Sequence, residues 1–424
     1  MRLSLKNIGK ISSASVEIHG ITVIAGENNT GKSTVGRALF AVFNSFYHIQ
    51  KQIEYERIQN IEKLISIIYS RLARRLIITR RNMDIAWTIV KHIEDYRNNA
   101  EAVKQVIINQ ILQYDESLEM DIHADYIEPL IMQILDALNV SDADIFQSIL
   151  EKKLDAEFNG QVNNIFMDSP GEIHLSVKDN EIMVIVEDNR VKPFTEKVDL
   201  QTEIIYIDDP FVLDEVRNTD AEDPWYADDC MGHREHLIKK LNRENRTNLI
   251  DEIVKDNKLQ KIYSRLSSVC SGEIVKNKRS GFGYQRKNTD KVLDVKNLSA
   301  GLKTFAILKR LLLNNTIEYN GIIILDEPEI HLHPEWQLLF AELIVLIQKE
   351  FGIHILLNTH SPYFLRAIQV YSAKYGRAEQ CKYYLSEMAG DQAGISDVTD
   401  CIEQIYVKLS RPLQKLEDER WMDD

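Results

Sequence analysis

Cysteine and long apolar runs are both scarce in this sequence. The chain of 424 residues holds only four cysteines, and no two of them form a CxxC pair. This spacing excludes a dense disulfide framework and argues against a structural zinc site, so a reducing compartment is expected. No run of about eighteen apolar residues occurs, and the first ten residues lack the apolar core of a signal peptide. We therefore expect a soluble, cytoplasmic protein that does not enter a membrane.

Positive charge is also in short supply. The chain carries 51 Lys and Arg against 65 Asp and Glu, which gives a formal net charge of -14. No global positive field would then draw the whole molecule onto nucleic acid, which stays a second candidate partner through local contacts only. In the one local basic cluster, a solvated helix face is favoured over a phosphate contact. Its members are Arg71, Arg74, Arg75, Arg80 and Arg81.

Glycine and proline are absent from residues 37 to 128. Apolar residues recur there at intervals of three and four, which is typical of helices. Alternating apolar runs before Gly26 and again from Glu203 onward predict strands, so the fold class is expected to be α/β. The expected parts are an α/β core at residues 1–40 and 200–400, an inserted, mainly helical lobe at 41–160, a β-hairpin of the core at 161–199 and a helical tail at 401–424.

A glycine-bearing loop follows the first apolar strand. Residues 26–33 read GENNTGKS, the GxxxxGK[ST] pattern, and a helical pattern begins directly after them. Glycines let consecutive amide groups turn toward one anion, and the start of the helix adds its positive end. The lysine reaches the β and γ phosphates, and the serine hydroxyl ligates Mg²⁺. The sequence therefore predicts a site for ATP and Mg²⁺ at Gly26, Asn28, Asn29, Thr30, Gly31, Lys32, Ser33 and Thr34.

An apolar run from Gly321 to Leu325 ends in two acids. Their carboxylates would emerge at the carboxyl edge of the sheet, where α/β proteins bind ligands. Asp326 is expected to hold Mg²⁺, and Glu327 is expected to polarise the water that attacks the γ phosphate.

Two further segments flank this acidic strand. Residues 298–303 read LSAGLK before it, and LLNTHSP, which contains His360, follows it. In order and character, the four segments resemble the Walker A, signature, Walker B and His-switch motifs of ABC-type P-loop ATPases. The resemblance implies that Ser299 and Gly301 meet the γ phosphate held by a second subunit, so that two copies clamp ATP head to tail. It also implies that His360 hydrogen-bonds the γ phosphate and helps to orient Glu327.

The match to that class has two gaps. The usual family signature reads LSGGQ, and this chain has Ala300 and Leu302 at the third and fifth places. No residue is assigned to the glutamine that links nucleotide to the inserted lobe in this class.

The segment that begins at Asp326 reads DEPEIHLHPEWQ. It is similar to the DEPE-x-HLHP segment of AAA-type ATPases related to RecF, SMC proteins and the overcoming-lysogenisation-defect proteins, which include the ATPase of Septu-like antiphage systems. The resemblance implies a homodimeric or larger ATP-driven switch that controls a separate effector, a nuclease or toxin, in bacterial antiphage defence. The alternative is a DNA-engaging repair or chromosome-maintenance ATPase. After His360, one final strand and the helical tail are expected, which leaves no room for a nuclease domain.

Three other features each keep more than one interpretation open. His331 and His333 suggest metal ligands, but packing is favoured because no third ligand is near in the sequence. The acidic segment at 208–229, which His233 and His236 follow, is read first as an exposed loop, second as a docking surface for a basic effector and third as a metal site. The helix expected at 402–421 either packs on its own core or docks a partner.

Overall fold

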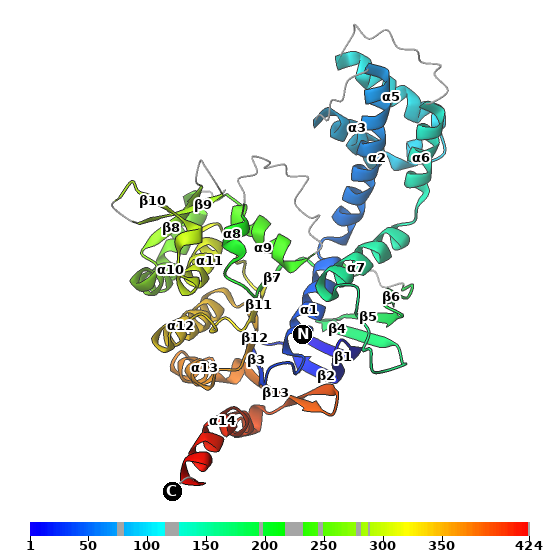
Figure 1. The fold of residues 1–424 in the computed structure, drawn as a ribbon. Helices are drawn as coiled ribbons and strands as arrows, with labels where there is room; N and C mark the ends of the chain where they lie inside the picture. The colour runs from blue at the N-terminus through cyan, green and yellow to red at the C-terminus, as the bar shows by residue number, and fades with distance from the viewer. Residues whose placement is uncertain are drawn as a thin grey trace. The chain divides into compact units, whose positions relative to one another are not determined.

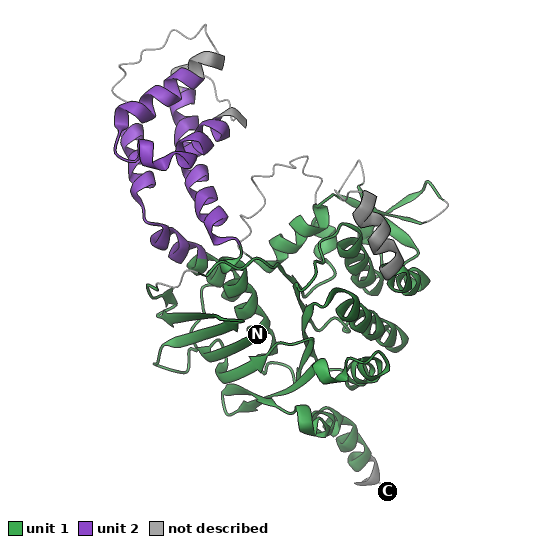
Figure 2. Ribbon diagram, turned by 180° about the vertical axis from the view of Figure 1, so that it is seen from behind, with its two compact units in different colours: residues 1–47, 150–424 green, residues 48–149 purple. Residues whose placement is uncertain are grey.

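The computed structural model describes residues 1–73, 80–114, 127–194, 198–216, 232–244, 249–276, 281–286 and 289–422. The chain divides into two compact units, coloured separately in Figure 2: residues 1–47 with 150–424, and residues 48–149. The side chains of the basic cluster and residues 217–229 of the acidic segment lie outside the described part.

Most of the helices and strands are labelled in Figure 1. The strands are β1 (Arg2–Ile8), β2 (Ile11–Glu17), β3 (Ile21–Gly26), β4 (Gly171–Val177), β5 (Asn180–Glu187), β6 (Arg190–Val191), β7 (Ile204–Ile207), β8 (Gly272–Lys276), β9 (Phe282–Arg286), β10 (Val292–Asp294), β11 (Ile322–Asp326), β12 (His354–Thr359), β13 (Cys381–Ala389) and β14 (Gln392–Asp397). The helices of the first unit are α1 (Lys32–Phe46), α8 (Val212–Glu215), α9 (His233–Asn242), α10 (Leu249–Val269), α11 (Ala300–Leu313), α12 (Pro334–Phe351), α13 (Pro362–Lys374) and α14 (Glu403–Met422), with 3-10 helices η2 (Val295–Asn297), η3 (Ala378–Gln380) and η4 (Thr399–Cys401). The second unit holds α2 (Ile49–Ala73), α3 (Arg80–Lys91), α4 (Ile93–Tyr96), α5 (Ala100–Tyr114), α6 (Ile127–Asn139) and the first part of α7 (Asp142–Phe158).

One large sheet organises the first unit. Its strand order is β6-β5-β4-β1-β2-β14-β13-β3-β12-β11-β7. The strands β13, β3, β12, β11 and β7 pair parallel with one another in that order, while β2, β1, β4 and β5 pair antiparallel with one another. Between these two groups, β14 is antiparallel to β13 and parallel to β2. A parallel centre joined to antiparallel strands, with helices between, confirms the predicted α/β class.

Helices cover both faces of the parallel strands, which explains their continuous apolar sequences. Leu325 and its neighbours on one face share a core with Phe305 of α11 and Phe340 of α12. On the other face, Gly36 of α1 lies against Ile324, close enough that an added Cβ would sit 3.1 Å from its methyl group. Figure 1 shows α11, α12 and α13 on one side of these strands and α1 on the other.

Two strands, not one, follow His360. β13 and β14 form an antiparallel hairpin, so the expectation of a single final strand is wrong. The sequence of β14 contains glycine and polar residues, and its pairing with β2 shifts register between Ala393 and Gly394. A short, irregular strand of this kind leaves no alternating apolar pattern to read.

The second unit is helical, as the absence of glycine and proline indicates. Its buried Arg57 donates hydrogen bonds from Nη2 to the Val140 carbonyl and to Asp142 Oδ1, both at 2.7 Å. This guanidinium therefore ties α2 to the turn between α6 and α7. None of the described helices in either unit is long and apolar enough to cross a membrane.

The tail helix α14 divides into two parts. Ile405 is fully buried, and Leu409 packs against the core of the first unit. Leu413 and Leu416, further along the helix, are exposed. The first turns of the helix therefore pack on the protein's own core, and the later turns leave their leucines uncovered.

Candidate functional site

The loop between β3 and α1 is held in a shape that needs its two glycines. Gly31 has a φ of 85°, a left-handed angle that side chains disfavour. A Cβ on Gly26 would lie 2.2 Å from the carbonyl oxygen of Ser386 on β13. Ser386 Oγ also donates to the Thr30 carbonyl at 2.6 Å. The loop is thus fixed against a strand far away in the sequence.

Lys32, the first residue of α1, turns its amine back into this loop. Its Nζ donates to the Glu27 carbonyl at 2.7 Å and to the Gly26 carbonyl at 3.2 Å. The same nitrogen lies 3.6 Å from Oε1 of Glu327. A buried ammonium group therefore stands between the loop and the acidic end of β11.

The remaining loop residues are arranged around a pocket. Asn28 is exposed, and Asn29 Oδ1 accepts a hydrogen bond of 2.6 Å from Lys10 Nζ. Ser33 and Thr34, at the start of α1, face the same pocket. The pocket is lined by Gly9, Lys10, Asn29, Thr30, Gly31, Lys32, Ser33, Thr34, Arg37, Phe158, Gln161, Asn163, Ile165, Phe166 and Glu327.

Asp326 ends β11 with both carboxylate oxygens occupied. Tyr206 of β7 donates its hydroxyl to Oδ2 at 2.8 Å, and Asn358 of β12 donates its amide to Oδ1 at 2.9 Å. Burial, together with the Asp326 charge, raises the pKa of Tyr206 well above its usual value, so the hydroxyl remains a proton donor. The two neighbouring strands therefore fix the orientation of this carboxylate.

Glu327 adopts a left-handed backbone angle, φ 50°, just past the strand. Its amide donates to the Asn358 carbonyl at 3.0 Å, which holds this turn against β12. Its Oε1 lies 3.4 Å from Nδ1 of His360, the residue that follows β12. The interaction with His360 lowers the pKa of Glu327, and the same interaction raises the pKa of His360.

The backbone of His360 is held by a buried acid. Its amide donates to Oε1 of Glu329 at 3.1 Å, and the Thr359 hydroxyl donates to the same oxygen. Burial raises the pKa of Glu329 in spite of these hydrogen bonds. Glu329 therefore fixes the backbone position of His360, whereas the side chain of His360 is about two-fifths exposed.

Sequence reasoning missed Tyr206, Asn358, Glu329 and Ser386. Glu329 and Asn358 stand inside recognised segments, so their polar character within apolar surroundings is a signal that could have been used. Tyr206 is separated from Asp326 by 120 positions, and only the alignment of β7 beside β11 brings them together.

The signature-like segment lies outside this assembly. Ser299 is the N-cap of α11 and accepts a hydrogen bond from the Leu302 amide at 3.4 Å. Gly301 packs so closely that an added Cβ would lie 2.8 Å from the His331 carbonyl oxygen. Lys303 is buried, and its Nζ contacts both carboxylate oxygens of Asp214 at 2.7 Å. Neither Ser299 nor Gly301 is among the described residues that line the loop pocket.

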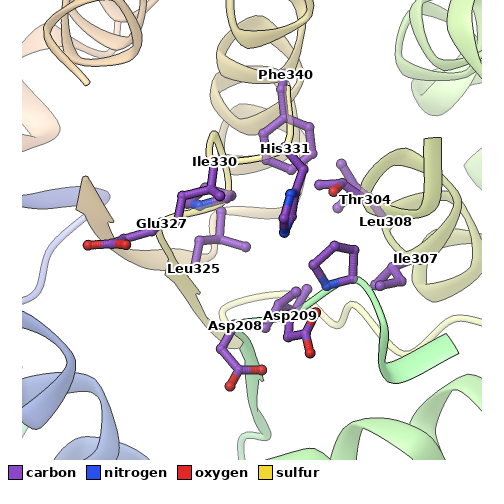
Figure 3. A pocket seen from close by; sticks show the side chains of 13 residues that line it. Asp208, Asp209, Thr304, Ile307, Leu308, Leu325, Glu327, Ile330, His331 and Phe340 are labelled. Carbon is purple, nitrogen blue, oxygen red and sulfur yellow. The ribbon is translucent and has the colours of Figure 1, made fainter. Parts of the chain in front are cut away.

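A second pocket separates the signature helix from the acidic strand. Figure 3 shows Thr304, Ile307 and Leu308 of α11 on one side, with Asp208 and Asp209 from the end of β7 below them. His331 lies beside the α11 side chains and above the two aspartates in this view, and its ring also meets Phe211 edge to face at 5.7 Å. Through this ring contact, His331 packs against Phe211.

A second histidine cluster, formed by His233, Glu157 and Asp208, lies against the ring of Tyr206. His233 stacks on the Tyr206 ring with 4.3 Å between centroids. Its Nδ1 lies 2.8 Å from Glu157 Oε2, and its Nε2 lies 3.0 Å from Asp208 Oδ2. Burial lowers the pKa of His233, but the hydrogen bonds to Asp208 and Glu157 outweigh burial and raise it to about 9.

The chain matches one protein family and is similar to several known proteins. Residues 1–365 match the family described as an AAA ATPase domain. The Septu protein PtuA of Bacillus thuringiensis is 32% identical over 90 residues, which are 21% of this chain and only 22% of that protein. The SMC head domain from Thermotoga maritima is 11% identical with a TM-score of 0.35, over 94% of this chain and 98% of that one. The SmcHead bound to the C-winged helix domain of ScpA is 11% identical with a TM-score of 0.42, over 93% and 96%.

The family match spans most of the chain, from β1 into α13, and includes the phosphate-type loop, the acidic strand and the histidine after β12. The resemblance predicted from the motifs is thereby confirmed at the level of the family, and the protein belongs to the AAA ATPase domain family.

Proposed function

We propose that this protein binds ATP with Mg²⁺ and hydrolyses it. The supporting observation is the meeting of three titratable groups at the carboxyl ends of adjacent strands. Oε1 of Glu327 lies 3.6 Å from the amine of Lys32 and 3.4 Å from Nδ1 of His360. A cation for phosphate and a carboxylate that orients water are groups that phosphoryl transfer to water uses, and an imidazole can donate a hydrogen bond to the γ phosphate.

Each residue has one role in this proposal. Lys32 exchanges its carbonyl partners in the loop for the β and γ phosphates, and the loop amides around Gly31 bind the same oxygens. Glu327 orients the attacking water and accepts its proton. His360 donates to the γ phosphate, and Glu329 positions it through the backbone.

The donors present suit Mg²⁺, which prefers oxygen ligands. The Ser33 hydroxyl lines the pocket, and the Asp326 carboxylate is oriented by Tyr206 and Asn358. Ser33 and Asp326 would hold the ion, Asp326 through water. When bound, Mg²⁺ neutralises charge on the phosphates.

Two copies share each nucleotide in this proposal. Ser299 and Gly301 begin a helix of fourteen residues, and its positive end suits a phosphate. Because these residues do not line the loop pocket of their own chain, we propose that they complete the pocket of a second copy in a head-to-tail dimer.

The ATP-dependent dimer controls a separate effector, a nuclease or toxin, in antiphage defence. The motif resemblance to Septu-like ATPases and the short match to the Septu protein PtuA support this role. The later turns of α14, with exposed Leu413 and Leu416, are available for a partner.

A mixing experiment tests hydrolysis and site sharing together. Lys32→Ala and Ser299→Arg chains should each release no phosphate from ATP. Mixed, they form heterodimers in which the Lys32→Ala chain supplies an intact signature to the Lys32 and Glu327 of its partner. Partial recovery of phosphate release is expected, up to the fraction of mixed dimers. No recovery, with heterodimers verified by native mass spectrometry, would argue against the shared site.

A further inference from the structure

The pocket around the phosphate-type loop has a second wall that the ATPase motifs do not explain. Polar loop residues and Lys32 line one part of it. Phe158, at the end of α7, and the apolar pair Ile165 and Phe166 also line it, together with the polar residues Gln161 and Asn163. A pocket that served phosphate alone would need no apolar wall.

This apolar wall is exposed to solvent although its side chains are large. Ile165 is 65% exposed, Phe166 is 52% exposed, and Met167 beside them is also exposed. Three consecutive exposed apolar residues are unusual on a protein surface and indicate a surface that binds something. Their position at the loop pocket indicates which ligand they meet.

The wall is held in place by its backbone. The Gly9 amide donates to the Val162 carbonyl at 2.8 Å, and the Asn164 amide donates to the Asn7 carbonyl at 2.9 Å. Asn164 Oδ1 in turn accepts from the Phe166 amide at 3.0 Å. The exposure of Ile165 and Phe166 is therefore a feature of an ordered segment anchored to β1.

Phe158 joins this wall to the phosphate-type loop. A Cβ on Gly9 would lie 3.9 Å from Cε1 of Phe158 and 3.2 Å from the methyl group of Thr34. Phe158 and Thr34 therefore both approach Gly9, and both line the pocket in which the phosphates of a nucleotide would lie. A base attached to those phosphates would extend from this point toward Ile165 and Phe166.

We propose that Phe158, Ile165 and Phe166 form the subsite for the base of the bound nucleotide. This inference rests on the proposed binding of ATP phosphates by the loop. Flat apolar side chains stack on the π face of a base, and every base has such a face. The subsite thus selects nucleoside triphosphates over inorganic polyphosphate.

Binding measurements on the full chain test this subsite. Calorimetry would follow a non-hydrolysable ATP analogue with Mg²⁺, and competition against the analogue would follow inorganic tripolyphosphate. Phe166→Ala should weaken the analogue about 5- to 100-fold, the range measured when stacking partners of bases are removed. Tripolyphosphate binding should not change, and Phe166→Trp should keep the affinity for the analogue. Tyr319→Ala, at an exposed tyrosine packed on Phe351, is the matched control.

The outcomes separate this inference from the proposed function. If Lys32→Ala abolishes analogue binding and Phe166→Ala has no effect, the subsite is wrong and the ATP site stands. If Phe166→Ala weakens the analogue and tripolyphosphate equally, Phe166 supports the loop and the base assignment is also wrong. If Lys32→Ala leaves analogue binding intact, the proposed ATP site itself is wrong.

Discussion

Two histidine–carboxylate clusters lie near the carboxyl ends of neighbouring strands, and they differ in openness. His360 is paired with Glu327 at 3.4 Å, and its side chain is 39% exposed. His233 is held between Glu157 and Asp208 at 2.8 and 3.0 Å, and its side chain is 14% exposed. The open pair can exchange its partner for a phosphate or water. In the closed cluster, both ring nitrogens of His233 are already paired with carboxylates, so we expect the cluster to stabilise the fold.

Matched substitutions in the two clusters should give opposite results. Glu327→Gln should slow ATP hydrolysis about 10²- to 10⁴-fold, because the amide keeps the shape but cannot accept a proton from water. The midpoint of unfolding should stay close to that of the wild type. Phosphate release and chemical denaturation measure the two quantities.

Glu157→Gln is the matched substitution in the closed cluster. Since Glu157 is fully buried and accepts from both the His233 ring and the His233 amide, its loss should lower the free energy of unfolding by about 3 kcal/mol. ATP hydrolysis below the unfolding transition should remain within a few fold. An inactive but stable Glu157→Gln protein would show that the closed cluster takes part in catalysis.

The second prediction concerns pH. The pKa of His233 is raised from 6.5 to about 9, so the charged ring stabilises the folded state fully below pH 6.5 and loses this effect as the pH rises through 9. Stability should therefore fall by up to about 3 kcal/mol over this window. Denaturation of the wild type and of His233→Gln at a series of pH values measures it. A slope that persists in His233→Gln would assign the effect to other groups.

The third and smallest effect concerns Tyr206, which touches both the closed cluster and Asp326. Tyr206→Phe keeps the ring that stacks on His233 but removes the hydroxyl that donates to Asp326. The Mg²⁺ concentration for half-maximal ATP hydrolysis should rise about tenfold, as expected for one hydrogen bond to a charged group. Tyr384→Phe, whose hydroxyl accepts from the Glu17 amide, is the matched control. Identical Mg²⁺ curves for Tyr206→Phe and wild type would remove Tyr206 from the site.

The residues around the open pair stand in motifs that can be recognised in the sequence, whereas those of the closed cluster do not. Lys32, Asp326 and Glu327 stand in short strings whose neighbours predict a strand and a turn, so local pattern and chemistry agree. His233 and Glu157 are 76 positions apart and belong to no motif. Only the three-dimensional packing of α7 beside α9 brings them together.

The fold shows the same limit. Regular apolar periods predicted the helical unit and the parallel strands, since those patterns are local. They could not give the boundary of the helical unit. α7 continues without interruption from the helical unit into the first unit, so the helical period is the same on both sides of residue 149. The repeat of apolar residues shows which face of a helix is apolar, but it does not show against which of the two units that face packs.

The place of the hairpin β13–β14 also has a consequence for the order in which the protein is synthesised. This hairpin lies between β2 and β3 in the sheet, and Ser386 on it supports the loop at Gly26 and Thr30. The ribosome makes Thr30 of the loop 356 residues before Ser386, which supports it. During translation, β2 and β3 therefore cannot pair with their final neighbours in the sheet until β13 and β14 have been synthesised.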